Sequence, residues 1–118
     1  MKNLAFVIED NKEISELFSR ALTVAGFQVE AICDGAIAQI RLEKESPTLV
    51  ILDMHLPGVN GDILLTEIRT KEHLKETKVI IATADAMLGE IYNDKADLVL
   101  EKPITFSQVT DFAIRFKK

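Results

Sequence analysis

The stretch Thr48-Leu49-Val50-Ile51-Leu52-Asp53-Met54-His55-Leu56-Pro57-Gly58 decides the fold of this chain. Its four consecutive apolar residues, Leu49–Leu52, predict a short strand covered on both faces, as in the centre of a parallel sheet. Asp53 follows this strand directly, and the Pro57-Gly58 pair marks a loop. In open α/β sheets the functional groups lie beyond the carboxyl ends of the strands, so Asp53 is the first candidate site residue.

Similar apolar runs recur on both sides of this stretch, separated by segments with helical periodicity. Helix-boundary signals include Asn11 as an N-cap, Gly26 as a terminator, and Thr105 with Gln108 at the spacing of a capping box. This alternation predicts a parallel sheet with helices on both faces. The predicted strands are Leu4–Ile8, Phe27–Ile32, Leu49–Leu52, Val79–Ala82 and Leu98–Leu100.

The predicted helices each present an apolar face to the core. In the helix predicted for Gly35–Lys44, we expect Ile37 and Ile40 to face inward. The segment from Ala86 to Asn93 is a short, weak helix candidate. The other residues expected to face inward are Ile14, Leu17, Phe18, Ala21, Leu22, Ala25, Ile63, Leu64, Ile68, Val109, Phe112, Ala113 and Phe116.

The composition restricts the classes of protein to which the chain can belong. With 118 residues, 47% hydrophobic and 28% charged, we expect one domain spanning residues 1–118. The net charge of −5 disfavours direct binding of nucleic acid, which depends on Lys and Arg neutralising phosphates. The single cysteine, Cys33, cannot form an internal disulfide, which fits a reducing, cytoplasmic compartment. The apolar runs are too short to cross a bilayer, so we expect no membrane insertion.

Polar side chains follow four of the predicted strands. They are Glu9 and Asp10 after the first strand, Asp53 after the third, Thr83 after the fourth and Lys102 after the fifth. Three carboxylates in one crevice repel one another, and a hard cation such as Mg²⁺ relieves this repulsion. A carboxylate beside such an ion can attack phosphorus and form an acyl phosphate, while an ammonium and a hydroxyl hold the phosphoryl oxygens.

Each of these residues also has a simpler interpretation when it is considered alone. Glu9 and Asp10 could be solvated acids near a helix start, where the helix dipole favours negative charge. Asp53 could be a loop or capping residue, Thr83 an ordinary strand residue and Lys102 a surface lysine at a turn. Their combination at the ends of four strands favours a chemical role.

Four motifs, in order along the chain, each close an apolar strand, and in these motifs the sequence resembles the receiver domains of two-component response regulators. The resemblance extends over essentially the whole chain, and the order of the motifs makes it specific. It implies a CheY-like, flavodoxin-like (βα)₅ fold, an α/β architecture whose five-stranded parallel sheet has the order 2-1-3-4-5. The matching residues are Val7-Ile8-Glu9-Asp10, Val50–Gly58 with Gly61, Ala82-Thr83-Ala84 and Glu101-Lys102-Pro103.

The resemblance assigns a metal site and a phosphoacceptor. Asp53 would accept the phosphoryl group and contribute to binding Mg²⁺. Asp10 would be a direct metal ligand, Glu9 would act mainly through a metal-bound water, and the backbone carbonyl of His55 would be a further ligand. The side chain of His55 would overhang the phosphoryl group and tune its lifetime.

The resemblance also assigns the groups around the phosphoryl oxygens. Thr83 and Lys102 would bind these oxygens, and the Lys102–Pro103 peptide bond would be cis, which proline permits at modest cost. Ala84 would leave room for the phosphoryl group. Asp85, two residues after Thr83, would modulate the lifetime of the phosphorylated state.

The sequence departs from the family in one region. Many receivers carry Tyr or Phe three residues before the lysine, where this chain has Val99. The interval from Thr83 to Lys102 is also about one helical turn shorter than the resemblance leads us to expect. We therefore predict a stunted fourth helix and an output face that works without an aromatic switch.

The resemblance implies a signalling switch with at most slow autophosphatase activity, and not an enzyme. A histidine kinase or a histidine phosphotransfer protein would donate the phosphoryl group to Asp53. The modified domain, a monomer or a weak phosphorylation-dependent dimer without an output domain in this chain, would change its affinity for an unknown protein target.

Two alternative functions stay open. The first is a phosphorylation-independent adaptor, an alternative that the valine at position 99 keeps open. The second is an aspartyl-phosphate phosphohydrolase, because such enzymes also pair a nucleophilic Asp with Mg²⁺. That class requires a second acid two residues after the nucleophile, where this chain has His55.

Overall fold

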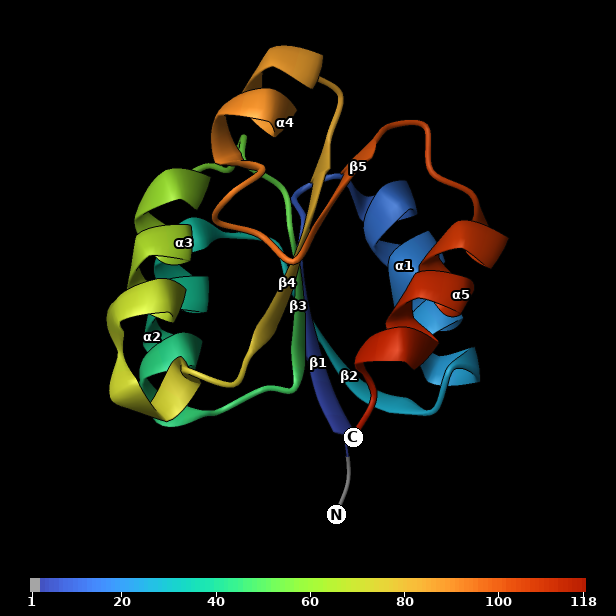
Figure 1. Ribbon diagram of the computed structural model, residues 1–118, viewed down its shortest axis with the longest axis horizontal. Helices are drawn as coiled ribbons and strands as arrows, with labels where there is room; N and C mark the ends of the chain where they lie inside the picture. The colour runs from blue at the N-terminus through green and yellow to red at the C-terminus, as the bar shows by residue number, and fades with distance from the viewer. Residues whose placement is uncertain (1–2) are drawn as a thin grey trace.

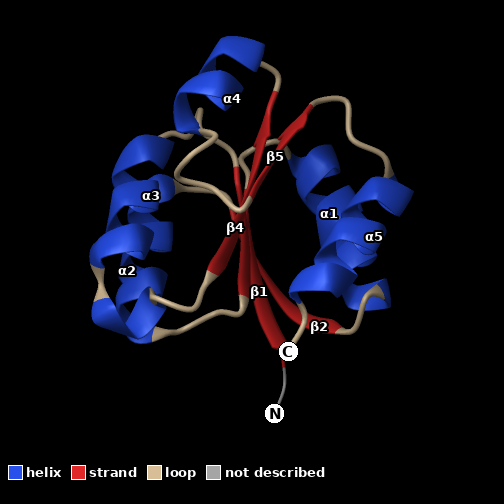
Figure 2. Ribbon diagram, in the orientation of Figure 1, coloured by secondary structure: helices blue, strands red, loops and turns tan. Residues whose placement is uncertain are grey.

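The computed structural model describes residues 3–118 and shows strands and helices that alternate along the chain (Figures 1 and 2). The first two residues of the predicted 1–118 domain lie outside the described residues. The elements are β1 (Asn3–Ile8), α1 (Lys12–Val24), β2 (Phe27–Ile32), α2 (Gly35–Lys44), β3 (Leu49–Leu52), α3 (Gly61–Thr70), a 3₁₀ turn (Glu72–Leu74), β4 (Lys78–Thr83), α4 (Ala86–Tyr92), β5 (Leu98–Glu101) and α5 (Phe106–Phe116).

The strands form one parallel sheet with the order β2-β1-β3-β4-β5, which confirms the predicted topology. β1 lies between β2 and β3, and its last residue, Ile8, is level with Leu52 of β3. Because all strands run in the same direction, their carboxyl ends meet at one edge of the sheet. Glu9 and Asp53 therefore follow neighbouring strands at the same level.

Two apolar cores lie on opposite faces of the sheet, because successive strand residues point to opposite sides. In β1, Ala5 and Val7 belong to the core beneath α1 and α5, whereas Phe6 and Ile8 belong to the core beneath α2 and α3. Figure 2 shows these helix pairs on the two sides of the sheet. All four residues are fully buried, which explains why β1 reads as a continuous apolar run.

The predicted caps of the first and last helices are confirmed. The Asn11 side chain accepts a hydrogen bond from the Ile14 amide at 3.0 Å and so caps α1. At the start of α5, the Thr105 hydroxyl accepts from the Gln108 amide at 3.2 Å, and the Gln108 side chain accepts from the Thr105 amide at 2.8 Å. This capping box satisfies two backbone donors that have no partner within the helix.

The prediction that Ile37 and Ile40 face inward is wrong, because these side chains are 51% and 52% exposed. The buried residues of α2 are Gly35, Ala38 and Leu42, at helical spacings of three and four. Gly35 and Ala38 are small, so this face of α2 can lie close to the backbone and side chains beneath it. The close packing of α2 against the rest of the domain thus decides which face of the helix is buried, even though the two isoleucines would bury a larger apolar area.

A similar correction applies to α3, where Ile63 is about half exposed and Leu65 is buried in its place. The predicted inward residues Leu64 and Ile68 are buried. The helix begins at Gly61, which is buried against the end of β3. Residue 63 lies about 200° around the helix axis from this contact and therefore points to solvent.

Helix α4 has seven residues and is the shortest α-helix in the described part of the chain. It lies beside β4 and β5, near the end of the sheet where Thr83 is found. A Cβ atom built on the buried Gly89 of α4 would lie 3.0 Å from Cγ1 of Val99 in β5. The absence of a side chain at Gly89 therefore lets α4 lie close to β5 at Val99.

The two ends of the described chain are joined by hydrogen bonds across the amino-terminal edge of the sheet. The Asn3 side chain accepts from the Lys118 amide at 2.7 Å and donates to the Lys118 carbonyl oxygen at 3.1 Å. Both ends lie together in Figure 1, away from the carboxyl ends of the strands.

Within residues 3–118, the structure contains no helix with the length and apolar character required to cross a membrane.

Candidate functional site

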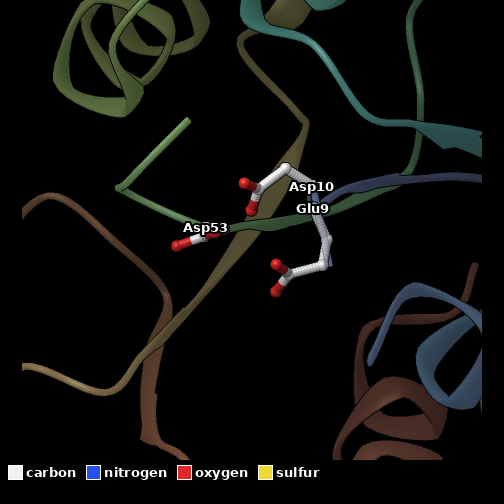
Figure 3. Close-up of side chains that lie close together, drawn as sticks. All are labelled: Glu9, Asp10 and Asp53. Atoms are coloured by element: carbon white, nitrogen blue, oxygen red, sulfur yellow. The ribbon is translucent and has the colours of Figure 1, made fainter. Parts of the chain in front are cut away.

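Three carboxylates gather beyond the ends of β1 and β3 (Figure 3). One oxygen from each of Glu9, Asp10 and Asp53 can be chosen so that all three lie within 4.8 Å of one another. Glu9 and Asp53 are buried, whereas Asp10 is exposed. The structure thus brings together the three acids that the sequence predicts at one site.

The backbone of the sheet fixes the relative height of these acids. The Asp53 amide donates to the Ile8 carbonyl oxygen at 2.9 Å, and the Glu9 amide donates to the Ile32 carbonyl oxygen at 3.0 Å. These bonds continue the parallel ladder beyond the last strand residues. Glu9 and Asp53 are therefore held by regular sheet geometry at the points where their side chains enter the site.

The environment of Asp53 favours its neutral form. Burial raises the pKa of Asp53 from 3.8 to about 6, and the nearby Glu9 carboxylate acts in the same direction. The His55 amide, which donates to Asp53 Oδ1 at 3.1 Å, and the Lys102 ammonium both lower this pKa. Two opposing influences therefore act on one carboxyl group: desolvation with like charge, and donors that favour the anion.

Lys102 enters the site from the end of β5 and pairs with Glu9. Its Nζ lies 2.7 Å from Glu9 Oε1 and 4.0 Å from Asp53 Oδ2. The Glu9 side chain is 1% exposed, and its two oxygens are bound by this ammonium and by the Asn11 amide, which donates to Oε2 at 3.2 Å. The sequence placed both residues in the site but gave no sign that they pair, because β3 and β4 separate their strands in the sheet.

Thr83 and Asp85 form a hydrogen-bonded turn between β4 and α4. The Thr83 hydroxyl accepts from the Asp85 amide at 3.0 Å, and the Asp85 side chain accepts from the amides of Met87 and Leu88 at 3.0 and 3.3 Å. Asp85 is thus the N-cap of α4. Sequence reasoning assigned it a role beside the phosphoryl group and missed this cap, although Asp before Ala86 is a recognisable helix-start signal.

The remaining predicted site residues lie around the same edge. His55 is exposed, and its backbone amide contacts Asp53 as described above. Ala84 is exposed and, with Lys102 and Pro103, borders a pocket against α1. The Lys102–Pro103 peptide bond is cis.

The donor set of this site fits Mg²⁺. Mg²⁺ prefers carboxylate and other oxygen ligands, and Glu9, Asp10 and Asp53 offer carboxylate oxygens close enough together for one ion. The exposed side of the site, at Asp10, leaves access for the water molecules that Mg²⁺ usually retains. The acids that repel one another are thus arranged where a cation would compensate their charge.

Comparison with known proteins gives matches across the chain. The family model described as the response regulator receiver domain matches residues 5–113. The chain is 38% identical over 78 residues to the phosphate regulon transcriptional regulatory protein PhoB of Rhizobium meliloti, covering 66% of this chain and 34% of that protein. It is 34% identical over 108 residues to the transcriptional regulatory protein HprR of Escherichia coli, covering 87% of this chain and 46% of that protein. The chain thus spans a third to a half of the length of these two relatives.

Solved structures share the fold at lower identity. A response regulator receiver domain from Methylobacillus flagellatus superposes with a TM-score of 0.86 at 24% identity, covering 99% of this chain and 100% of that one. The receiver domain of the sensor histidine kinase PA1611 from Pseudomonas aeruginosa, solved with a magnesium ion in its active-site cleft, gives a TM-score of 0.86 at 23% identity, with 98% of each chain covered. With the family model matching residues 5–113, the chain belongs to the response regulator receiver domain family of two-component signalling.

Proposed function

We propose that this receiver domain is a signalling switch that is phosphorylated on Asp53 in a Mg²⁺-dependent reaction. The observation that carries the proposal is the position of the Asp53 carboxylate, close to the acids Glu9 and Asp10 and 4.0 Å from the Lys102 ammonium. Such a site combines a nucleophile, a cation-binding set and a fixed positive charge. These are the components that phosphoryl transfer to a carboxylate requires.

Asp53 supplies the nucleophile in the proposed reaction. Its ionised Oδ atom forms a bond to phosphorus while the bond from phosphorus to the donor's imidazole nitrogen breaks, and the imidazole keeps the electron pair. No general base is needed, because the attacking oxygen carries no proton above the pKa of Asp53, which is about 6. The donor would be a histidine kinase or a histidine phosphotransfer protein.

The cation would be held by Asp10 and Asp53 directly, by Glu9 through a water molecule, and by the backbone carbonyl of His55. When bound, Mg²⁺ neutralises charge on the oxygens of the transferring group and orients them. The magnesium-containing cleft of the PA1611 receiver domain supports this assignment by similarity of fold.

Lys102 and Thr83 would bind the phosphoryl oxygens after transfer. Lys102 Nζ is already 4.0 Å from Asp53 Oδ2, so moving from Glu9 to the new oxygens needs a short displacement. The Thr83 hydroxyl would exchange its bonds with Asp85 for a phosphoryl oxygen. Ala84 leaves space at this position, while His55 and Asp85 would affect how fast the acyl phosphate hydrolyses.

The signal would leave through the surface of α4 and β5 without an aromatic switch. Val99 and Gly89 form a close contact there, and both lie beside Thr83 in one surface pocket. A movement of Thr83 would therefore reach α4 directly. The modified domain, as a monomer or a weak dimer, would then change its affinity for a protein partner.

The test is labelling with acetyl phosphate, followed by intact-mass measurement. We expect the mass of one phosphoryl group to be added when Mg²⁺ is present and not when EDTA replaces it. Hydroxylamine should remove the added group, and the Asp53→Asn variant should not gain it. Asp10→Asn should raise the Mg²⁺ concentration needed for labelling. Lack of labelling by acetyl phosphate and by histidine kinases would favour an adaptor, and multiple turnover of small phosphoesters would favour a phosphohydrolase.

A further inference from the structure

We infer that the first turn of α2, through Asp34 and Gly35, positions the loop between β3 and α3 (residues 53–60, the β3–α3 loop) for cation binding and phosphorylation. This inference rests on the proposed function. None of the sequence motifs that indicated the site includes Asp34 or Gly35. The assignment comes from backbone contacts between α2 and the loop that begins with Asp53.

Gly35 meets the β3–α3 loop backbone to backbone. Its amide donates to the Pro57 carbonyl oxygen at 2.9 Å. A Cβ atom at position 35 would lie 1.9 Å from the carbonyl oxygen of Val59 and 2.7 Å from its backbone nitrogen. No side chain fits in this contact, so the loop can take its observed position only because residue 35 is glycine.

The helix side of this contact is held firmly. The Asp34 side chain caps α2 by accepting from the amides of Ala36 and Ile37 at 2.8 and 3.1 Å. Ala38 and Leu42 of the same helix are 0% and 1% exposed in the core. The loop side is more open, because residues 55, 57, 58 and 60 are exposed. A side chain at position 35 would therefore displace the loop more easily than the helix.

The other end of the loop is fixed close to its beginning. A Cβ atom on Gly61 would lie 2.6 Å from Cα of Met54 and 3.0 Å from the carbonyl oxygen of Asp53. The loop thus returns to its own first residues at Gly61, and Gly35 of α2 holds the part between. His55 lies in this part, and its amide donates to Asp53 Oδ1 at 3.1 Å.

Displacing the loop at Val59 and Pro57 would therefore move His55 relative to Asp53. The acids Glu9 and Asp10 would stay in place, because they directly follow β1, which Gly35 does not contact. The expected defect is consequently weaker cation binding with the nucleophile still present. This pattern differs from that of a general loss of folded protein. Such a loss would reduce the fraction of molecules that bind Mg²⁺ without changing the affinity of the molecules that remain folded.

The test compares Gly35→Ala with wild type. NMR monitors a titration of each protein with Mg²⁺, and acetyl phosphate labelling is measured separately. We expect the Mg²⁺ concentration for half-saturation to rise about tenfold, the usual scale for losing a group that orients a metal ligand. The labelling rate at saturating Mg²⁺ should stay within about twofold, since the bond from the Asp53 amide to the Ile8 carbonyl oxygen still holds Asp53 beside β1. The His55 amide resonance should also shift in metal-free protein.

Three further variants separate positioning from stability. Asp34→Ala removes the cap and should weaken Mg²⁺ binding, whereas Asp34→Asn keeps an acceptor at the N-cap and should restore it. Leu42→Ala destabilises the same helix without touching the loop and should leave the half-saturation concentration unchanged. If Gly35→Ala fails to fold, the Asp34 pair decides the question.

Two results would overturn the inference: a folded Gly35→Ala with the Mg²⁺ affinity and His55 resonance of wild type, or an Asp34→Ala that binds Mg²⁺ as Asp34→Asn does. Failure of the proposed function would look different. In that case wild type itself would neither bind Mg²⁺ nor be labelled, while the metal-free His55 resonance of Gly35→Ala would still report whether α2 positions the loop.

Discussion

Asp53 carries an energetic cost in the folded, metal-free domain. Burial raises the pKa of Asp53 to about 6 in the folded state, above the 3.8 of a free side chain. A raised folded-state pKa means that the fold favours the neutral acid. Its contribution to stability is therefore fully present below about pH 4 and is lost as the pH rises through about 6.

We expect Asp53→Asn to stabilise the metal-free domain at pH 8 and to have little effect near pH 4. The amide has the shape of the neutral acid and never ionises, so the gain at pH 8 should be about 1–3 kcal/mol. Urea unfolding in EDTA at the two pH values measures it. A gain of equal size at both pH values would show that the charge of Asp53 is not the cause.

The pair formed by Glu9 and Lys102 should show strong energetic coupling. Lys102→Met leaves the Glu9 carboxylate buried without its ammonium, a loss of up to about 3–5 kcal/mol. Adding Glu9→Gln removes the stranded charge, so the double variant should be more stable than Lys102→Met alone. Denaturant unfolding of the four proteins in this cycle measures the coupling, and additive effects would contradict the observed pair.

At the level of single residues, the sequence was most informative where the backbone alone determines proximity. Glu9 and Asp53 follow adjacent strands that end at the same level of the sheet. The proximity of these two side chains could therefore be predicted from the positions of the strand ends. The contact of Lys102 with Glu9 depends on two long side chains reaching across two intervening strands. The role of Asp85 as a cap shows that a polar residue near a site can be engaged by the backbone instead.

At the level of elements, α2 shows how close packing overrides the size of apolar side chains. Periodicity alone allowed Ile37 and Ile40 to face inward, because both orientations bury apolar residues. The structure instead buries Gly35, Ala38 and Leu42. The deciding contact is between Gly35 and a loop distant in sequence, which no local pattern encodes.

Two alanine substitutions in α2 should therefore have very different effects on stability. Leu42→Ala removes a side chain that is 1% exposed and should cost about 2–5 kcal/mol. Ile40→Ala removes one that is 52% exposed and should change stability by less than about 0.5 kcal/mol. Chemical denaturation compares them directly. The opposite ranking would mean that α2 is rotated from the orientation described above.

At the level of the whole molecule, the alternation of strands and helices predicted a parallel sheet, but it did not specify the strand order. That order came from the family resemblance, since several arrangements satisfy the same alternation and crossover rules. The observed sheet agrees with it. The strand ends predicted from the apolar runs agree with the observed ends to about one residue. Strands buried on both faces are apolar throughout, so the sequence changes sharply from apolar to polar where each strand reaches the surface.

Binding of Mg²⁺ should stabilise the entire domain. At a free concentration of 100 times Kd, a ligand specific for the folded state adds about 2.7 kcal/mol, which should appear as a higher Tm. The rise in Tm should be larger at pH 8 than at pH 5, because protons compete for Asp53 below its pKa of about 6. Thermal melts with Mg²⁺ and with EDTA measure it. An equal rise in Asp10→Asn would show that the ion binds elsewhere.

The hydrogen bonds between Asn3 and Lys118 make the folded chain close to a ring. A short peptide could therefore join residue 118 to residue 3, and the chain could be opened instead at the exposed turn between Asp94 and Lys95. Such a circular permutant should keep the sheet order and the Mg²⁺-dependent labelling of Asp53. It would also place new termini beside α4, where a reporter could follow that helix without being attached to the acidic site.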